Sequence, residues 1–306
     1  MKFLSLLVAL LIEQVRPLRR GNRLYVSFAS YAARLDRHFN GGQYRHGIIA
    51  WLLAVLPVVV ATLAVSLLLA GMSPVLAWLW NIAVLYVTMG FRQFSHYFTE
   101  IILALQEGRL DQAREFLGKW RGEATAEFGA NEIARVAIEL GLIGSHRHVF
   151  GPIACFIVLG PSAAVLYRAA AMLGERWGMR GDPESGDFGR FAERFFFWFD
   201  WLPSRLTAAS FAIVGNFEDA VYCWRTQARS WTMHSLGIIV ASGGGAIGVR
   251  LGDTLHQHGS MQYRPEMGTG EEADVDYMQS AVGLIWRALV LWLFLVLLVT
   301  IAHSLG

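Results

Sequence analysis

Lysine is almost absent from this sequence, in which Lys2 and Lys119 are the only two. A Walker-type phosphate loop needs a lysine after its glycine-rich run, so this nucleotide-binding motif is excluded. Charge is scarce as well: charged residues make up 16% of the chain, whereas an average soluble domain carries about 25%. Because 55% of the residues are hydrophobic, the chain has too little polar surface for a soluble protein, and we expect it to lie in a lipid bilayer.

Clusters of cysteine and of other metal ligands are also lacking. Cys155 lies in an apolar stretch and Cys223 beside one, which favours buried thiols over a disulfide or a metal site. His256 and His258 are two positions apart, but no further ligands stand near them in the sequence. The sequence therefore predicts no metal site.

Long apolar runs define the predicted fold. The clearest is residues 48–70, which carries no charge and exceeds the ~20 residues that span a bilayer. We expect an all-α, polytopic helical membrane protein with four to six membrane elements, some of them broken or re-entrant. The candidate elements are residues 48–70, 75–91, 149–171, 205–217, 235–251 and 282–302. We expect residues 1–306 to form a single membrane domain, with 92–147 as a helical cytoplasmic insertion and 252–280 as a polar loop.

The distribution of arginine predicts the orientation. Residues 16–45 contain seven arginines and one acidic residue, Asp36. Loops with an excess of positive charge stay on the cytoplasmic side of a membrane. This segment is therefore expected in the cytoplasm, and the chain in the bacterial inner membrane as a multi-pass protein.

The rest of the chain is organised around residues 131–168, where a charged helix becomes an apolar span. His146, Arg147 and His148 stand at the junction, and the Gly-Pro pairs 151–152 and 160–161 follow. Proline lacks the donor that a helix interior needs, and inside a membrane such a break survives only where protein or water satisfies the freed backbone groups. Two interpretations stay open: a broken or re-entrant element with a polar mouth, or a kinked structural span.

Basic residues near this junction suggest an anion site, because arginine forks suit carboxylates and phosphates. In this interpretation a set of basic side chains surrounds an anionic group at the cytoplasmic face, and the alternative for each arginine is an interaction with lipid headgroups. The set consists of His146, Arg147, His148, Arg168, Arg205 and Arg250.

Acidic candidates are fewer. Glu132, Arg135 and Glu139 are spaced to share one face of a predicted helix, and the simplest interpretation is a solvated, salt-bridged stripe. Glu139 is also a candidate for metal binding or base catalysis, together with Asp200. Both roles depend on a family resemblance.

Several segments, taken in order, resemble the CobD/CbiB family of membrane proteins, which act in adenosylcobinamide-phosphate synthesis. The segments that carry the resemblance are EGRLDQAR at 107–114, IARVAIE at 133–139, YRA at 167–169, WLPSRLTA at 201–208 and AIGVRLG at 246–252. The resemblance covers roughly the whole chain. It adds Tyr167 and Trp201 to the candidate ligand-binding residues. It also implies ATP and Mg²⁺ as requirements if the chain is a working synthase.

Two departures from the family pattern concern the site. Family members carry an asparagine and acids where this chain has residues 143–148, so that His146, Arg147 and His148 reverse the local charge. The family's Asn-Thr-Leu-Asp run after Tyr-Arg-Ala is replaced by residues 171–174. The chain is also similar to the AmpE proteins, at residues 11–14, 159–161 and 212–217.

Two functions follow from this resemblance. In the first, the chain binds an anionic or amphiphilic ligand, corrinoid-type or derived from the cell wall, and its ligase chemistry is altered or lost. In the second, it is a working carbon–nitrogen ligase that joins an aminopropanol or its phosphate to adenosylcobyric acid, with ATP and Mg²⁺. A transporter is the weaker third class, because no paired inverted repeat is visible. We expect membrane lipids and an anionic or corrinoid small molecule as partners, expect no nucleic acid, and leave room for a homo-oligomer.

Overall fold

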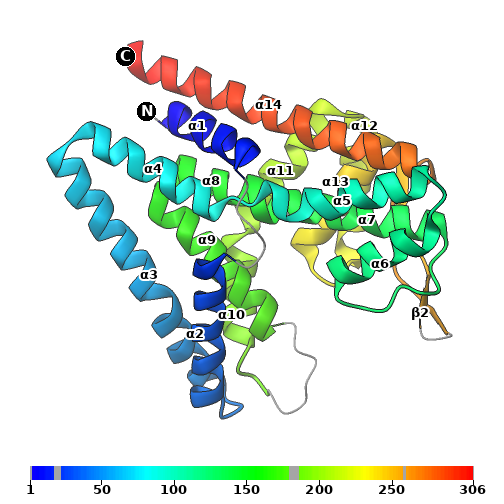
Figure 1. The fold of residues 1–306 in the computed structure, drawn as a ribbon, viewed down its shortest axis with the longest axis horizontal. Helices are drawn as coiled ribbons and strands as arrows, with labels where there is room; N and C mark the ends of the chain where they lie inside the picture. The colour runs from blue at the N-terminus through cyan, green and yellow to red at the C-terminus, as the bar shows by residue number, and fades with distance from the viewer. Residues whose placement is uncertain (1, 17–21, 179–185, 258–259, 306) are drawn as a thin grey trace. The chain divides into compact units, whose positions relative to one another are not determined.

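Helices dominate the computed structural model, which describes residues 2–16, 22–178, 186–257 and 260–305 (Figure 1). The all-α prediction is confirmed. The chain groups into two compact units, the first containing residues 1–90, 147–203 and 303–306 and the second residues 91–146 and 204–302. Residues 17–21 of the arginine-rich segment, and His258 of the histidine pair, lie outside the described residues. The single membrane domain stays a prediction.

The first unit combines helices from residues 1–90, among them one within the arginine-rich segment, with helices from residues 147–203. These are α1 (Lys2–Val15), α2 (Arg23–Phe39), α3 (Tyr44–Met72), α4 (Pro74–Thr88), α8 (Gly151–Leu159), α9 (Pro161–Leu173), the π-helical turn η2 (Gly174–Gly178) and α10 (Arg190–Phe199).

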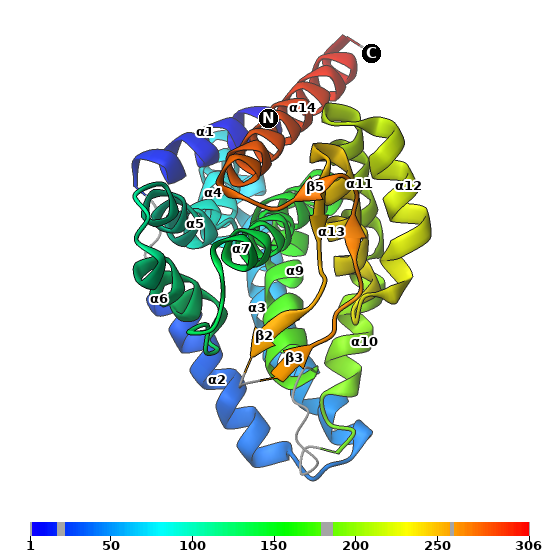
Figure 2. The same cartoon turned by 90° about the vertical axis from the view of Figure 1, so that its right-hand side faces the viewer.

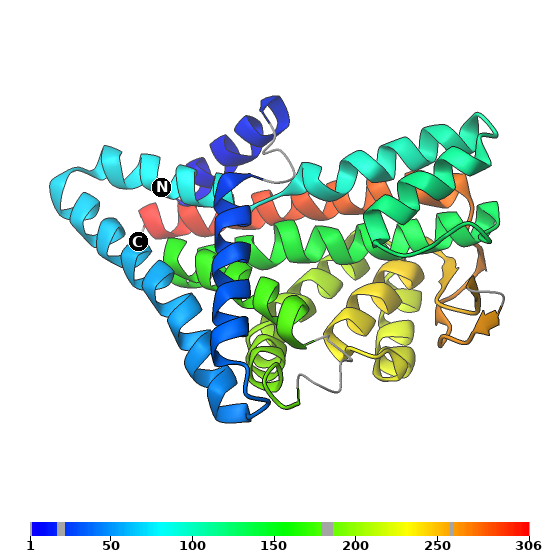
Figure 3. The same ribbon diagram turned by 60° about the horizontal axis from the view of Figure 1, so that its bottom comes forward.

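A tight turn joins α3 and α4 into a hairpin (Figures 1 and 3). Ser73 ends α3 with extended backbone, and its hydroxyl accepts a hydrogen bond from the Val75 N–H, while Pro74 occupies the first position of α4. Serine as N-cap followed by proline is a favoured helix start. At its other end α3 is joined to α2 through residues 40–43, and the two helices diverge from this connection (Figures 1 and 3).

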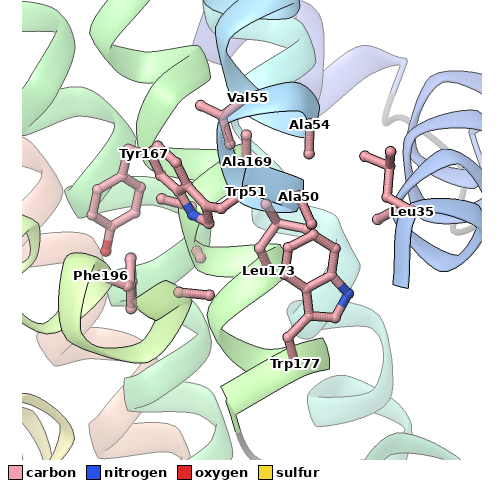
Figure 4. Close-up of a cluster of buried hydrophobic side chains, with 14 of the residues drawn as sticks. Leu35, Ala50, Trp51, Ala54, Val55, Tyr167, Ala169, Leu173, Trp177 and Phe196 are labelled. Carbon is pink, nitrogen blue, oxygen red and sulfur yellow. The ribbon is translucent and has the colours of Figure 1, made fainter. Parts of the chain in front are cut away.

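The core of the first unit lies where α3, α9, η2 and α10 pack together (Figure 4). Trp51 of α3 packs edge-on against Phe191, and Tyr167 of α9 packs against Phe196 of α10. Trp177 contributes a further buried ring from η2. Aromatic pairs of this kind add stabilisation beyond the area that they bury.

The second unit combines the polar insertion with the C-terminal third of the chain. Its helices are α5 (Phe91–Gln106), α6 (Leu110–Arg121), α7 (Ala130–Ser145), α11 (Trp201–Val214) from Ser204 onward, α12 (Phe217–Gln227), the 3-10 turn η4 (Ala228–Ser230), α13 (His234–Ile247) and α14 (Val275–Leu305) as far as Ala302.

Glycines let these helices approach closely. A Cβ on Gly243 of α13 would lie 2.6 Å from Leu142, and one on Gly245 would lie 2.6 Å from the Asp219 carbonyl oxygen. The glycine-rich run of α13 therefore serves helix packing, the role that small residues have at membrane helix interfaces.

Short strands lie in and just before the stretch predicted as a polar loop, residues 252–280, and α14 begins within it at Val275 (Figure 2). They are β1 (Val249–Leu251), β2 (Leu255–Gln257), β3 (Ser260–Gln262), β4 (Met267–Gly268) and β5 (Glu271–Glu272). β1 lies between β4, which is antiparallel to it, and β5, which is parallel, while β2 and β3 form a separate hairpin. The Gln227 side chain bonds both backbone groups of Gly268, at 2.9 Å to its carbonyl and 2.7 Å from its N–H.

Three helices among the described residues are long and apolar enough to cross a membrane: Tyr44–Met72, Ala130–Leu159 and Val275–Ala302. The shorter apolar helices are Pro74–Thr88 and His234–Ile247. The prediction of four to six elements counted such shorter helices as well. In an apolar 18-residue window of each helix, 17% of the residues are buried in Tyr44–Met72 and 67% in Ala130–Leu159, so the latter window is mostly surrounded by protein.

One of the two predicted helix breaks is observed. The chain breaks between α8 and α9 at Gly160, whose φ of 88° lies in the left-handed region that glycine tolerates. The helix does not break at Gly151–Pro152. Instead, the π-helical turn η1 (His146–Phe150) connects α7 to α8, and π-helical turns are frequent at functional sites.

Gly151 is present because the ring of Tyr167 occupies the space of a side chain. A Cβ on Gly151 would lie 2.2–2.5 Å from Tyr167 atoms. We expect Gly151→Ala to destabilise the protein by about 1–3 kcal/mol, the usual cost of overpacking a core. The measurement is thermal unfolding of the purified protein in detergent.

Gly71→Ala is the matched control, since nothing lies within 4 Å of the Cβ that it would add, and it should leave the melting temperature unchanged or raise it. An unchanged melting temperature for Gly151→Ala would mean that Tyr167 does not pack there.

Candidate functional site

The candidate residues are divided between the two units. The first unit holds Arg147, His148, Tyr167, Arg168, Asp200 and Trp201, and the second holds Glu139, His146, Arg205 and Arg250. Within each unit, the structure links some of these residues directly and leaves others apart.

Pro152 determines the surroundings of Arg168. Because Pro152 has no N–H, the chain lacks the one donor that would reach the His148 carbonyl in an α-helix or the Arg147 carbonyl in a π-helix, at the point where η1 passes into α8. The His148 carbonyl accepts instead from the Gly90 N–H at 3.0 Å, and the Arg147 carbonyl accepts from Arg168 Nη1 at 2.9 Å. Neighbouring segments thus satisfy the freed carbonyls, as a helix in an apolar environment requires.

The two arginines of this region are placed differently. Arg147 is nearly buried and forms an ion pair with the Glu175 carboxylate of η2. Arg168 is 7% exposed. Its Nε donates to the Tyr25 hydroxyl at 3.3 Å, and its guanidinium lies 5.4 Å from the centre of the Tyr25 ring. His148 is half-buried.

Tyr167 and Asp200 form a fully buried pair. The Tyr167 hydroxyl donates to Asp200 Oδ1 at 2.8 Å, and neither side chain is exposed. This hydrogen bond ties α9 to Asp200, the residue that ends α10. Trp201 follows Asp200 in the chain, but 45% of its surface is exposed, so it does not share this burial.

Three of the second unit's candidates differ in burial. His146 is completely buried, with its Nδ1 2.9 Å from the Thr207 hydroxyl. Arg205 is half-buried, and Arg250 is exposed on β1.

Glu139 holds the turn after β1. Its Oε2 accepts from Arg264 Nη1 at 2.7 Å, and its Oε1 accepts from Arg264 Nη2 at 3.1 Å and from the Gly252 N–H at 2.8 Å. Arg264 also donates to the Gly252 carbonyl at 2.8 Å and lies 5.6 Å from the centre of the Trp231 ring. Both oxygens of this buried carboxylate are therefore engaged within the fold.

Arg135 and Glu132 extend the same contact along α7. Arg135 donates to Asp253 at 3.2 Å and to the Thr254 carbonyl at 2.6 Å, and Glu132 bonds His256 Nδ1 at 2.8 Å. The Thr254 N–H, with a contribution from the Arg135 guanidinium, holds the pKa of the Asp253 carboxyl below its usual range. The predicted solvated stripe is instead an anchored face, since Arg135 and Glu139 are buried.

Four important partners were missed by reasoning from the sequence: Arg264, Glu175, Thr207 and Tyr25. Arg264 could have been noticed in the sequence, because it is an isolated arginine in the polar segment after β1. The other three could not have been noticed, because their roles depend on contacts between segments that are distant in the sequence.

The candidate carboxylates lack the arrangement that a Mg²⁺ site requires. Mg²⁺ prefers oxygen ligands from one or two carboxylates, together with water and phosphate. Among the described residues, no group of three or more His, Cys, Asp or Glu side chains could hold a metal ion. Glu139 already accepts three hydrogen bonds. These donors do not fit a preformed Mg²⁺ site.

Replacing Glu139 tests whether it is structural. We expect Glu139→Gln to lower the free energy of unfolding by about 3 kcal/mol, the lower end of the cost for breaking a buried ion pair, because Arg264 keeps some exposure. The measurement is thermal unfolding in detergent.

Glu132→Gln on the same helix is the control, with an expected loss below about 1 kcal/mol because its partner His256 is exposed. The double variant Glu139→Leu with Arg264→Met should recover much of the stability. If Glu139→Gln leaves stability unchanged but removes activity, Glu139 acts in catalysis.

Comparison with known proteins bears out the resemblance. A family model described as CobD/Cbib protein matches residues 6–285. The cobalamin biosynthesis protein CobD of Stutzerimonas stutzeri is 34% identical over 299 residues, which cover 96% of this chain and 97% of that protein. CobD of Chromobacterium violaceum is 35% identical over 238 residues, 75% of this chain and 76% of its own length.

CobD of Streptococcus sanguinis, at 25% identity, aligns with 86% of this chain and 84% of its own length. No solved structure matches the chain significantly. The AmpE-like features are not confirmed. A family model that covers most of the chain, and a CobD protein that aligns nearly end to end, show that this chain belongs to the CobD/CbiB family of cobalamin biosynthesis membrane proteins.

Proposed function

We propose that this protein binds an anionic, corrinoid-type or amphiphilic ligand at the cytoplasmic face of the bacterial inner membrane, and that the ligase chemistry of its family is altered or lost. One observation carries the proposal. Both oxygens of the Glu139 carboxylate, the chain's better candidate for metal or base duty, are bound by Arg264 and Gly252. Glu139 therefore serves the fold.

The other carboxylate supports the same conclusion. Asp200 is fully buried and accepts the Tyr167 hydroxyl hydrogen bond. ATP-driven amide formation relies on Mg²⁺, which needs accessible carboxylate oxygens. The resemblance implies acids where this chain has His146, Arg147 and His148, and basic side chains around η1 favour direct binding of an anion.

The second candidate function is a working synthase that joins an aminopropanol or its phosphate to adenosylcobyric acid, with ATP and Mg²⁺. The end-to-end alignment with CobD of Stutzerimonas stutzeri favours it. In that case Arg264 would have to release Glu139 before this carboxylate could act.

Genetic complementation distinguishes the two functions. A strain lacking its synthase is supplied with this chain or with CobD of Stutzerimonas stutzeri as positive control, and adenosylcobinamide phosphate is measured. We expect product from the control and none from this chain, because its candidate carboxylates are engaged. Production that is abolished by Asp200→Asn, at equal membrane abundance and melting temperature, would establish the synthase instead.

Ligand binding is measured separately on the purified protein by equilibrium dialysis with adenosylcobyric acid. We expect binding that weakens about tenfold in Arg147→Gln, since a charge-assisted hydrogen bond contributes roughly 1.5–3 kcal/mol. Arg176→Gln is the control, because Arg176 is exposed in the neighbouring turn. Absence of binding by the folded protein would contradict a corrinoid ligand.

A further inference from the structure

The first unit contains an apolar cavity of about 600 Å³ between α2, α3, α4 and α9. Most of its lining is aliphatic or aromatic, and Arg168 is its one charged lining residue among the described residues. Its volume falls within the range of pockets that hold small ligands, which typically combine an apolar wall with a few polar groups.

Arg168 brings a buried positive charge to this cavity. Within the described residues its hydrogen-bond partners are neutral, the Tyr25 hydroxyl and the Arg147 carbonyl, and it forms no ion pair. The Glu175 carboxylate also acts on it electrostatically but pairs directly with Arg147. Buried charges are normally paired, because their desolvation is costly. The cavity therefore offers a charge that an anion would complement.

Helix α3 lines the cavity with some of its residues and exposes apolar residues elsewhere on its surface. Val58 and Thr62 of α3 line the cavity, while Leu56, Val60 and Leu63 on the same helix are exposed and apolar. Such a face in a 29-residue apolar helix is expected to contact lipid tails. On the α2 side, Leu24 and Tyr31 belong to the lining and are themselves exposed, so the cavity has an open side along α2.

We propose that this cavity binds one anionic phospholipid of the surrounding membrane, with its phosphate at Arg168 and an acyl chain among the apolar residues of α2, α3, α4 and α9. An arginine guanidinium forms paired hydrogen bonds with phosphate oxygens. The apolar lining suits the chain, and the neighbouring bilayer supplies the lipid. This inference names one anionic, amphiphilic ligand for the protein. It rests on the proposed function only in taking the group bound at Arg168 to be an anion.

Mass spectrometry of the full chain, purified in dodecyl maltoside, tests the site. We expect about one phosphatidylglycerol-class lipid per chain, enriched over the detergent extract. Arg168→Gln should lower this occupancy about tenfold, the factor for one lost charge-assisted hydrogen bond. Arg168→Lys should restore part of it, and Arg176→Gln should leave it unchanged.

Two further measurements keep the inference testable if Arg168→Gln does not fold. Ala83→Trp fills the cavity from α4 and should expel the lipid, while Leu79→Trp, at an exposed position of α4 outside the lining, should not. With the unaltered protein, dodecyl phosphate should displace the lipid, whereas dodecyl maltoside and inorganic phosphate should not, because each lacks the charge or the chain.

Equal occupancy by phosphatidylethanolamine, retention of the lipid in Arg168→Gln, or a free fatty acid in its place would overturn the inference. The corrinoid assays are independent of these readouts. Loss of the lipid site with corrinoid binding intact refutes only this inference, and absence of corrinoid binding with the lipid present refutes only the corrinoid ligand of the proposed function.

Discussion

The missing N–H of Pro152 is the constraint on which the first unit depends. Where the π-helical turn η1 meets this proline, the helix is short of donors, and the carbonyls of Arg147 and His148 accept from Arg168 and Gly90. This requirement holds the end of α4, the turn η1 and α9 in contact. It also fixes the Arg168 guanidinium in position, so that one side chain completes the backbone of η1 and places its charge at the cavity.

Ion pairs between α7 and the segment that follows β1 stabilise the second unit. Glu139 of α7 pairs with Arg264, which lies between β3 and β4, and Arg135 of α7 pairs with Asp253 in the turn after β1. Gly252 and Asp253 both have a positive φ, of 73° and 59°, and Glu139 accepts a hydrogen bond from the Gly252 N–H in this turn. Because breaking either pair would leave a charge without its partner, the turn and the helix are stable only together.

Much of the fold could be predicted from the sequence, because apolar runs and their flanks specify membrane helices. The uncharged run at 48–70, the turn at Ser73–Pro74 and the break at Gly160 all follow from local chemistry. The helix through Gly151–Pro152 does not, because its continuity depends on donors from Gly90 and Arg168, far along the chain. The ion pair of Glu139 with Arg264 could not be predicted for the same reason. The spacing of Glu139 with Glu132 and Arg135 defines a helix face, but it does not show whether water or Arg264 covers that face.

The contact of Gln227 with Gly268 has a consequence for assembly. β4 lies at the edge of its small sheet, and an open strand edge invites pairing with a second chain. The Gln227 amide bonds both the N–H and the carbonyl of Gly268, as the backbone of a neighbouring strand would. A second polypeptide therefore cannot pair with β4 at that residue.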